Sequence, residues 1–245
     1  MKLKLNNWST RLLYLLLATD FIFISLHILY KATDFISDPL FSLEQDLGYA
    51  EVFQYIKEYW IALCLGLLAA TNRSLVYLSW SLLFLYLLVD DSLQIHETWG
   101  ESLSQHLSLS PMFNLRMQDF GELIVSSSIG LFFLILIGTS YKFSDRLSRK
   151  SSKYLIGMLL SLALFGIAID LVHVAFRSFP MSSLLGLLED GGEHGVMSVI
   201  AWFVFLLPEA LQSKNSVFPS MSWKDHSHED LKSGIKRIPE SQKQS

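Results

Sequence analysis

Acids and histidines at the ends of long apolar segments are the residues of this sequence best suited to chemistry. Carboxylates and imidazoles together bind Zn²⁺, Mn²⁺ or iron, and they also exchange protons. The residues of this kind are Asp90, Asp91, His96, Glu97, Glu122, Asp170, His173 and Glu193. Ionisable groups in or beside membrane spans are costly, which makes them functional candidates. The sequence therefore predicts one polar site where four apolar segments end.

The spacing of these residues predicts shared helix faces. Asp90, Gln94 and Glu97 follow an i, i+4, i+7 pattern, and Asp170 and His173 are three residues apart. At a rise of about 1.5 Å per residue, Asp90 and Asp170 would each lie roughly 10 Å inside the apolar boundary. Acids in the last turns of a helix oppose its dipole, so these acids need a cation, a metal or a shared proton.

Candidate roles follow from this pattern. The predicted metal ligands are His96, Glu122, Asp170, His173 and Glu193, and the predicted base toward a metal-bound water is Glu97 or Asp91. A wider polar network comprises Asp20, His27, Asp90, Glu189, Asp190 and His194. The expected cofactor is a divalent transition metal, namely Zn, Fe or Mn.

The arrangement is similar in part to four-helix di-metal carboxylate sites. Those sites combine carboxylates from two helices with Glu-x-x-His pairs from two others. Asp170-x-x-His173 fits that spacing, whereas His96-Glu97 and Glu193-His194 do not. A polar network without a metal, in which buried acids pair with each other, is the alternative.

Helix capping offers a structural explanation for two of the acids. Asp119-Phe-Gly-Glu122 and Asp190-Gly-Gly-Glu193 both fit a capping box with an acid at the N-cap and Glu at N3. On this interpretation Gly191 and Gly192 form a tight entry into the last helix. Capping accounts for Glu122 and Glu193 as well as metal binding does.

Asp20 and His27 lie seven residues apart in the first apolar segment, with Asp20 near its middle. One interpretation is a buried acid satisfied by a Ser or Thr hydroxyl. The other is a proton relay that feeds the site at the segment ends.

Apolar blocks predict an all-α integral membrane protein with a bundle of about six transmembrane helices. The 245-residue chain is 51% hydrophobic, and its blocks are long enough to cross a bilayer. The predicted spans are roughly 12–30, 55–71, 74–97, 120–141, 154–176 and 192–211, within one membrane domain at 1–211. We expect the first span to stay uncleaved and residues 212–245 to form a disordered cytoplasmic tail.

Charge asymmetry predicts the orientation. If both termini are cytoplasmic, 15 of the 19 lysines and arginines lie on the inner side. The acid–histidine site would then face outward. The expected location is the plasma membrane, of the bacterial inner-membrane type, with a multi-pass topology.

Three function classes remain open. The first is a metal-dependent membrane hydrolase or oxidoreductase that acts on a lipid or another apolar small molecule. The second is an ion or proton transporter with the acids as its vestibule, and the third is a non-catalytic assembly or partner protein. The inner halves of the spans carry few ionisable groups besides Asp20, which favours an enzyme over a transporter. Membrane lipid is the expected partner; no basic stripe for nucleic acid is present, and the oligomeric state is left open.

Overall fold

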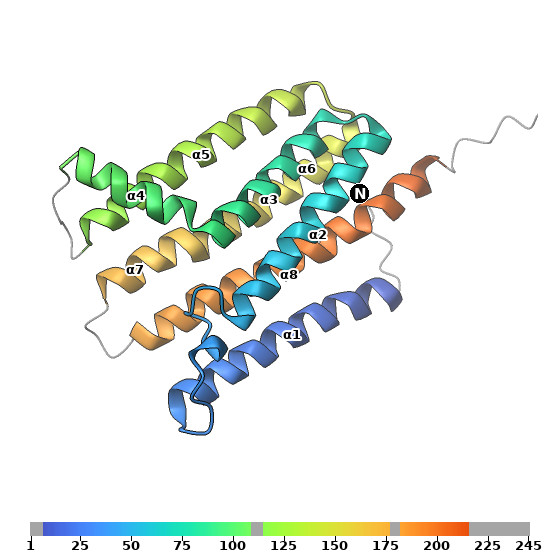
Figure 1. The fold of residues 1–245 in the computed structure, drawn as a ribbon. Coiled ribbons are helices and arrows are strands. Elements are labelled where there is room, and N and C mark those ends of the chain that lie inside the picture. Colours follow the sequence, from blue (N-terminus) through green and yellow to red (C-terminus); the bar gives the residue numbers. More distant parts are fainter. Residues whose placement is uncertain (1–6, 109–114, 177–181, 216–245) are drawn as a thin grey trace, which may run out of the picture. The chain divides into compact units, whose positions relative to one another are not determined.

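The computed structural model describes residues 7–108, 115–176 and 182–215, and within these ranges the regular structure is helical. The helices are α1 (Asn7–Ala32), α2 (Tyr49–Asn72), α3 (Leu75–Leu93), α4 (Ile95–His106), α5 (Met117–Lys142), α6 (Arg146–Ala163), α7 (Asp170–Ala175) and α8 (Ser182–Asn215). A short 3-10 helix, Pro39–Phe41, follows α1, and a π-helical stretch, Leu164–Ile169, joins α6 to α7. Figure 1 shows the long helices running side by side.

Six helical segments are long and apolar enough to cross a membrane. They are Asn7–Ala32, Tyr49–Asn72, Leu75–Leu93, Met117–Lys142, Arg146–Ala175 and Ser182–Leu211. The all-helical class and the number of segments predicted from the sequence are therefore confirmed. Helix α8 includes residues 212–215, which the sequence assigned to the tail. The prediction for residues 216–245 lies outside the described residues.

Local sequence signals set the helix ends. Arg73 ends α2 in the left-handed conformation, with φ 49°, and its N–H donates to the carbonyl of Ala69. The Asp145 side chain accepts hydrogen bonds from the backbone N–H groups of Leu147 and Ser148 and so begins α6. Because α2 ends at Asn72 and α3 begins at Leu75, the connection between them is short, and α2 packs along α3.

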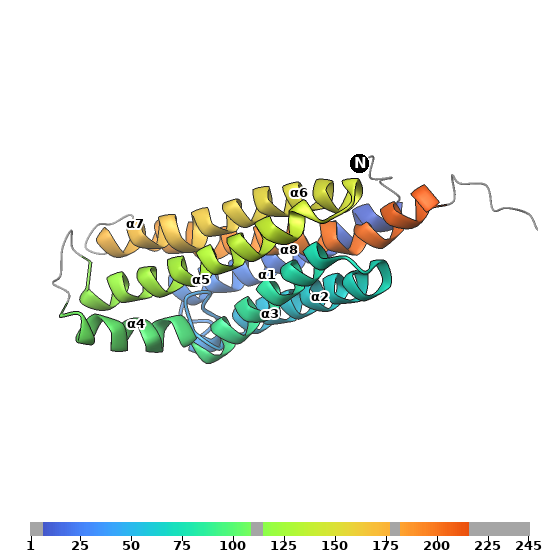
Figure 2. The ribbon, with the colours of Figure 1, turned by 90° about the horizontal axis from the view of Figure 1, so that it is seen from above.

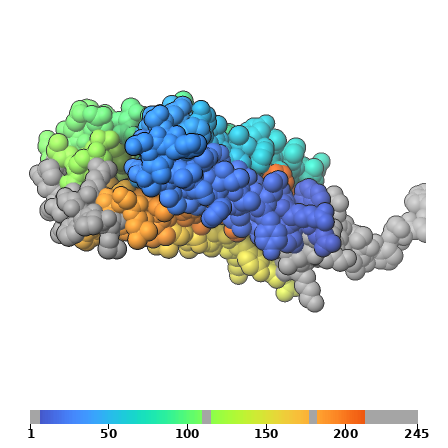
Figure 3. All heavy atoms as spheres, turned by 90° about the horizontal axis from the view of Figure 1, so that it is seen from below, coloured from blue at the N-terminus to red at the C-terminus, as the bar shows by residue number. Residues whose placement is uncertain are grey.

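The bundle exposes many large apolar side chains and buries several charged ones. Leu15, Phe21 and Leu160 are 65%, 68% and 64% exposed, whereas the side chains of Lys57 and Glu58 in α2 are fully buried. A water-soluble core would show the opposite distribution. Figure 2 shows the helices from above, and Figure 3 shows α1 and the segment after it covering one face.

Serine hydroxyls join α3 to α5 and α6 away from the acidic residues. The indole Nε1 of Trp80 donates to Ser152 Oγ at 2.8 Å, and Ser79 Oγ donates to Ser140 Oγ at 3.0 Å. These residues are buried. Small hydroxyl side chains let helices approach closely and hydrogen-bond in an apolar medium, so this cluster explains the packing of that half of the bundle.

Candidate functional site

A fully buried glutamate on α2 is the centre of the candidate site. Glu58 is 0% exposed, and among the described residues no N–H or hydroxyl group donates to either of its carboxylate oxygens. Its hydrogen-bonding neighbour is the carboxyl of Asp91 on α3, and Glu193 of α8 is a further acidic neighbour. Two carboxyls can hydrogen-bond only through a shared proton. The three acids therefore need a proton or a metal cation at this position.

Asp90 holds His96 beside these acids. The Asp90 carboxylate accepts from the backbone N–H of His96 at 2.9 Å and lies 3.1 Å from its ring Nδ1. This hydrogen bond raises the pKa of His96 to about 9, against the opposing effect of burial. With Nδ1 directed to Asp90, the other ring nitrogen is the one left to bind a ligand. Ligand atoms of Asp90, Asp91 and His96 all lie within 4.8 Å of one another.

A reversal of the chain brings His96 back to Asp90. Helix α3 ends at Leu93, and Gln94 adopts the left-handed conformation with φ 50° before α4 begins at Ile95. The predicted span to residue 97 and the shared helix face of Asp90, Gln94 and Glu97 are therefore wrong. The contact between Asp90 and His96 arises from the turn rather than from helical spacing.

Glu97 and Glu122 lie where α4 crosses α5. The pKa of Glu97 is raised by burial and, next, by the nearby carboxylate of Asp46, and Glu122 also raises it. The Glu122 carboxylate accepts from Gln118 Nε2 at 2.7 Å. The helices approach so closely that a Cβ atom on Gly121 would lie 2.0 Å from the carbonyl oxygen of Gly100. These two glycines therefore allow α4 to lie against α5.

The π-helical turn makes room for Glu193. A Cβ atom on Gly166, inside this turn, would lie 1.9 Å from Glu193 Oε1. π-Helical turns often occur at functional sites because they shift the helix register locally. On α8, Gly192 faces the ring of Phe165, and a Cβ atom at this glycine would lie 2.2 Å from the ring carbon Cδ1. Glycine at both points lets α8 and the π-helical turn lie in close contact.

A second histidine, His173 on α7, lies beside two acids of α8. His173 Nδ1 is 2.8 Å from Glu189 Oε2, and Asp190 Oδ2 is buried with no hydrogen-bond partner among the described residues. Asp190 has Glu189, Glu44, His173 and Asp170 as electrostatic neighbours. Glu193 has both Asp91 and Asp190 as neighbours. Electrostatic interactions therefore link Glu58 of α2, Asp91 of α3 and Asp190 of α8 to Glu193.

His27 connects the segment after α1 to this cluster. Its Nδ1 accepts from the backbone N–H of Leu43 at 3.0 Å, so a neutral His27 carries its proton on Nε2. That nitrogen lies 4.0 Å from Glu44 Oε1, and Glu44 also pairs with Lys31 at 2.7 Å. This contact positions Glu44 over α8, where a Cβ atom on Gly186 would be 3.2 Å from its Oε1.

A buried charge network lies deeper in the bundle. Lys57 Nζ is 3.0 Å from Asp20 Oδ1, 3.0 Å from the carbonyl oxygen of His194 and 3.3 Å from its Nδ1. Ser198 Oγ donates to Asp20 Oδ2 at 2.5 Å. Asp20 therefore has the hydroxyl partner that one interpretation of the sequence predicts, and it also has a lysine partner that the sequence does not predict.

The capping interpretation is wrong for both acid pairs. Asp119 occupies N3 of α5, where its carboxylate accepts from the backbone N–H of Arg116 at 2.7 Å, and Glu122 lies one turn further in. Asp190 and Glu193 lie inside α8, which begins at Ser182 in the described residues. Gly191 and Gly192 are likewise helical and do not form a helix entry.

The structure divides the predicted site residues into groups. Asp90, Asp91 and His96 come together, and His173 pairs with Glu189. Glu193 has Asp91, Asp190, Glu189 and Asp170 as electrostatic neighbours. Glu122 lies instead with Glu97 at the α4–α5 crossing.

The sequence did not single out Lys57 and Glu58, which lie at the start of the predicted span 55–71, before its apolar core. The helix begins earlier, at Tyr49. The spacing of Glu51, Gln54 and Glu58 (i, i+3, i+7) would have indicated a polar helix face.

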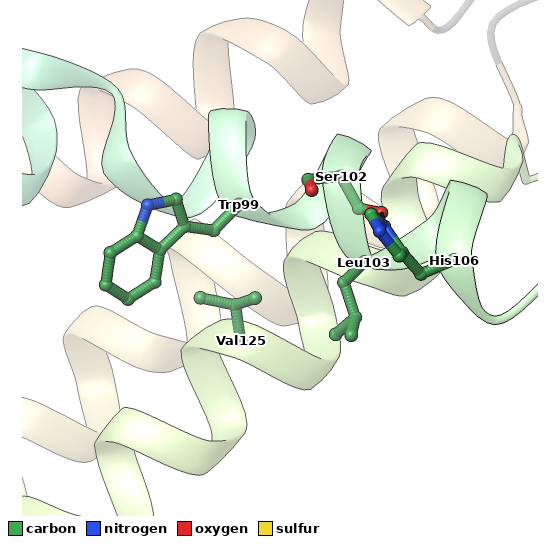
Figure 4. Close-up of a pocket in the computed structure, with 5 residues that line it drawn as sticks. All are labelled: Trp99, Ser102, Leu103, His106 and Val125. Atoms are coloured by element: carbon green, nitrogen blue, oxygen red, sulfur yellow. Dashed lines mark hydrogen bonds between the residues drawn. The ribbon is translucent and has the colours of Figure 1, made fainter.

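A pocket of about 260 Å³ lies between α4 and α5. Its first lining residue, Trp99, comes two residues after Glu97 in the sequence. Trp99, Ser102, Leu103 and His106 of α4 and Val125 of α5 line it. Figure 4 shows Leu103 and Val125 directed toward the space between the two helices. Its lining is mainly apolar, so it suits part of an apolar molecule.

The fold and site define a helical bundle with six segments able to span a membrane and a buried carboxylate–histidine cluster at one end. Residues 10–208 match the family described as a domain of unknown function (DUF8692), and the chain belongs to this family. The matched region contains all the acids and histidines discussed above. No curated protein and no solved structure matches the chain.

Proposed function

We propose that this protein is a multi-pass membrane enzyme that binds a divalent transition metal at its acid–histidine cluster and acts on a lipid or another apolar substrate. The observation that carries the proposal is Glu58, a fully buried carboxylate without a hydrogen-bond donor among the described residues. A buried charge without a partner is strongly unfavourable, so the position requires a proton or a metal cation, and the proposal assigns a metal.

Charge balance supports a metal at this position. Lys57 is paired with Asp20, and His96 is paired with Asp90. None of the close ion pairs among the described residues includes the carboxylates of Glu58, Asp91 or Glu193. Oxygen ligands with one imidazole suit Zn²⁺, Mn²⁺ or Fe²⁺. Glu58, Asp91, His96 and Glu193 are the proposed ligands, and Asp90 fixes the orientation of His96.

Glu97 is the proposed general base. It is the residue after His96, and burial raises its pKa, which makes the carboxylate a stronger proton acceptor. The pocket lined by Trp99, Leu103 and Val125 begins within one turn of Glu97 on the same helix. It would hold an apolar portion of the substrate. Asp91, the alternative base from the sequence, is better suited as a ligand because it contacts Glu58.

The membrane orientation is part of the proposal. With both termini in the cytoplasm, 15 of the 19 basic residues lie inside, and the cluster faces outward. The inverted burial pattern, with apolar side chains outside and charges inside, supports insertion into a bilayer. The proposed location is a plasma membrane of the bacterial type.

A proton transporter is the second candidate. Lys57 and Glu58 are consecutive, as are Glu193 and His194, so the deep charge network and the proposed metal-binding cluster meet at two points. Such a continuous series of ionisable groups is typical of proton pathways. Proteoliposomes carrying an imposed pH gradient would show proton flux if this candidate is correct.

Metal content and turnover together test the enzyme proposal. Protein purified from metal-replete medium should contain Zn, Mn or Fe, and Glu58→Gln should lose it while Glu101→Gln, on an exposed position of α4, keeps it. Glu97→Gln should retain the metal but fail to convert lipid extracts followed by mass spectrometry. Folded wild-type protein that binds none of these metals would refute the proposal.

A further inference from the structure

We propose that residues 33–48, which connect α1 to α2, form a lid over the part of α8 beside His173, and that His27 is a latch that releases this lid when its imidazole becomes protonated. The inference concerns the conformation of the fold, and it holds whether or not the acid–histidine cluster binds a metal. Figure 3 shows this segment lying with α1 over one face of the bundle.

The lid is folded, and residues 42–44 anchor it to α1. One of its turns is closed by the backbone N–H of Ser42, which donates to the carbonyl oxygen of Pro39 at 2.8 Å. Phe35 is 87% exposed, whereas Ser42 and Leu43 are buried. The attachment of the lid to α1 therefore depends on this short buried stretch.

His27 of α1 accepts the central hydrogen bond of this anchor. The residue is buried, and its Nδ1 accepts from the backbone N–H of Leu43 at 3.0 Å. Ser42 Oγ lies 3.3 Å from the same nitrogen. An imidazole nitrogen that accepts a hydrogen bond carries no proton, so this contact belongs to the neutral ring with its proton on Nε2.

A second proton on His27 removes this acceptor. Both ring nitrogens of an imidazolium are donors, so the N–H at Nδ1 would face the N–H of Leu43. Ser42 Oγ can accept from the protonated ring, but the buried N–H of Leu43 then loses its acceptor. An unpaired buried backbone donor is costly, and the anchor is therefore favourable only while His27 is neutral.

The charged groups next to His27 do not replace the lost hydrogen bond. Glu44 Oε1 lies 4.0 Å from His27 Nε2, but the other oxygen of this carboxylate pairs with Lys31 at 2.7 Å. The Glu44 side chain is also 32% exposed, which weakens its attraction for a positive ring. Lys31, one turn further along α1, repels such a ring.

The neighbouring helices place their ionisable groups deeper in the bundle. Lys57 of α2 and His194 of α8 contact Asp20, which lies seven residues, or about two turns, before His27 on α1. These groups are paired with one another. Among the ion pairs of the described residues, those of His27 involve Glu44 and no carboxylate of α8.

Release of the anchor would lift Glu44 from α8. A Cβ atom on Gly186 of α8 would lie 3.2 Å from Glu44 Oε1, 3.0 Å from His173 Cε1 and 3.5 Å from His173 Nε2. The carboxylate of the lid and the ring of His173 therefore lie beside the same point of α8. Asp190 of α8 is an electrostatic neighbour of both. Opening of the lid would uncover His173 at this end of the bundle.

The test is the distance between two spin labels on the full-length protein in lipid nanodiscs, measured by double electron–electron resonance. Phe35→Cys in the lid and Leu184→Cys on α8 carry the labels at exposed positions, in a Cys64→Ser background. We expect a short, narrow distance distribution at about pH 8 and a longer, broader one at about pH 5, on the two sides of the usual histidine pKa of about 6.5. His27→Asn should keep the short distance at both pH values, because its Oδ1 accepts from Leu43 in place of Nδ1 and does not titrate.

A second label pair controls for a general loosening of the bundle. Ile22→Cys on α1 with Leu184→Cys should give the same distance at both pH values, because neither residue belongs to the lid. A lid distance that stays short at the lower pH would overturn the proposal. So would equal lengthening in His27→Asn, which would assign the response to another group, or a matching change in the control pair. If His27→Asn does not fold, His27→Gln, which also cannot be protonated, decides in its place.

Discussion

Removing the charge of Lys57 should destabilise the bundle strongly. Its ammonium group is fully buried, 3.0 Å from Asp20, and it also donates to the carbonyl oxygen of His194. Lys57→Met keeps most of the side-chain volume but leaves Asp20 as a buried carboxylate with Ser198 Oγ as its remaining side-chain donor among the described residues. Breaking a buried ion pair by removing one partner costs about 3–5 kcal/mol, and we expect a loss of this size.

A double-mutant cycle isolates the charge effect. Replacing both partners, as in Asp20→Leu with Lys57→Met, removes the buried charge altogether, and such replacements are often neutral. The double variant should therefore recover most of the stability lost in the single variant. The assay is reversible unfolding in mixed micelles, which gives the free energy of unfolding of each variant.

Two results would refute this reasoning. Lys57→Met could cost less than about 1 kcal/mol, a value typical of an exposed pair. The two substitutions could also be additive, which would mean that Asp20 and Lys57 do not interact in the folded protein. Tyr59→Phe, at an exposed position two residues along α2, is the matched control and should leave the stability nearly unchanged.

Three further predictions follow from the same structure. Gly121→Ala should separate α4 from α5, because the added methyl group would overlap a backbone carbonyl of α4; faster proteolysis within 98–108 would show this, and unchanged cleavage would contradict it. Ser152→Ala should cost about 1–3 kcal/mol by leaving the buried indole N–H of Trp80 without an acceptor, whereas a stability equal to wild type would contradict it. In metal-free protein the ion pair between Asp90 and His96 should stabilise the fold fully below about pH 6.5 and lose this effect as the pH rises through about 9. The reason is that the pKa of His96 is raised in the folded state. The free energy of unfolding of a His96→Asn variant should show no such pH dependence.

Long apolar runs made the fold predictable. Each of the six runs is long enough to cross a bilayer, and a helix is the conformation that satisfies its own backbone in lipid. The helix ends were less predictable, because the apolar stretch around Ile61 is short and belongs to a helix that begins at Tyr49. In the sequence Lys57 and Glu58 precede the apolar core of the predicted span, although both side chains are fully buried in the bundle.

The composition of the site was predictable, but its pairing was not. Acids and histidines at segment ends indicated where the polar cluster lies. Which acid contacts which histidine depends on the left-handed turn at Gln94 and on the π-helical turn at Gly166. Neither turn has a clear sequence signal, because Gln rarely adopts a positive φ and π-helical turns share their composition with α-helices.

The capping interpretation failed for a related reason. An acid followed three residues later by Glu describes a capping box only where a helix begins. Asp190 and Glu193 lie inside α8, and the preceding turns of that helix supply the hydrogen-bond partners of their backbone N–H groups. The two acids are therefore available for other contacts.

The position of a bound metal ion tests the central claim most directly. Crystals of the full-length protein loaded with Zn²⁺ and measured at the zinc absorption edge should show an anomalous peak about 2.0–2.2 Å from carboxylate oxygens of Glu58 and Asp91. A matched crystal of Glu58→Gln should lack that peak. An ordered, folded protein with no peak at Glu58, or with zinc bound only at surface residues, would contradict the account.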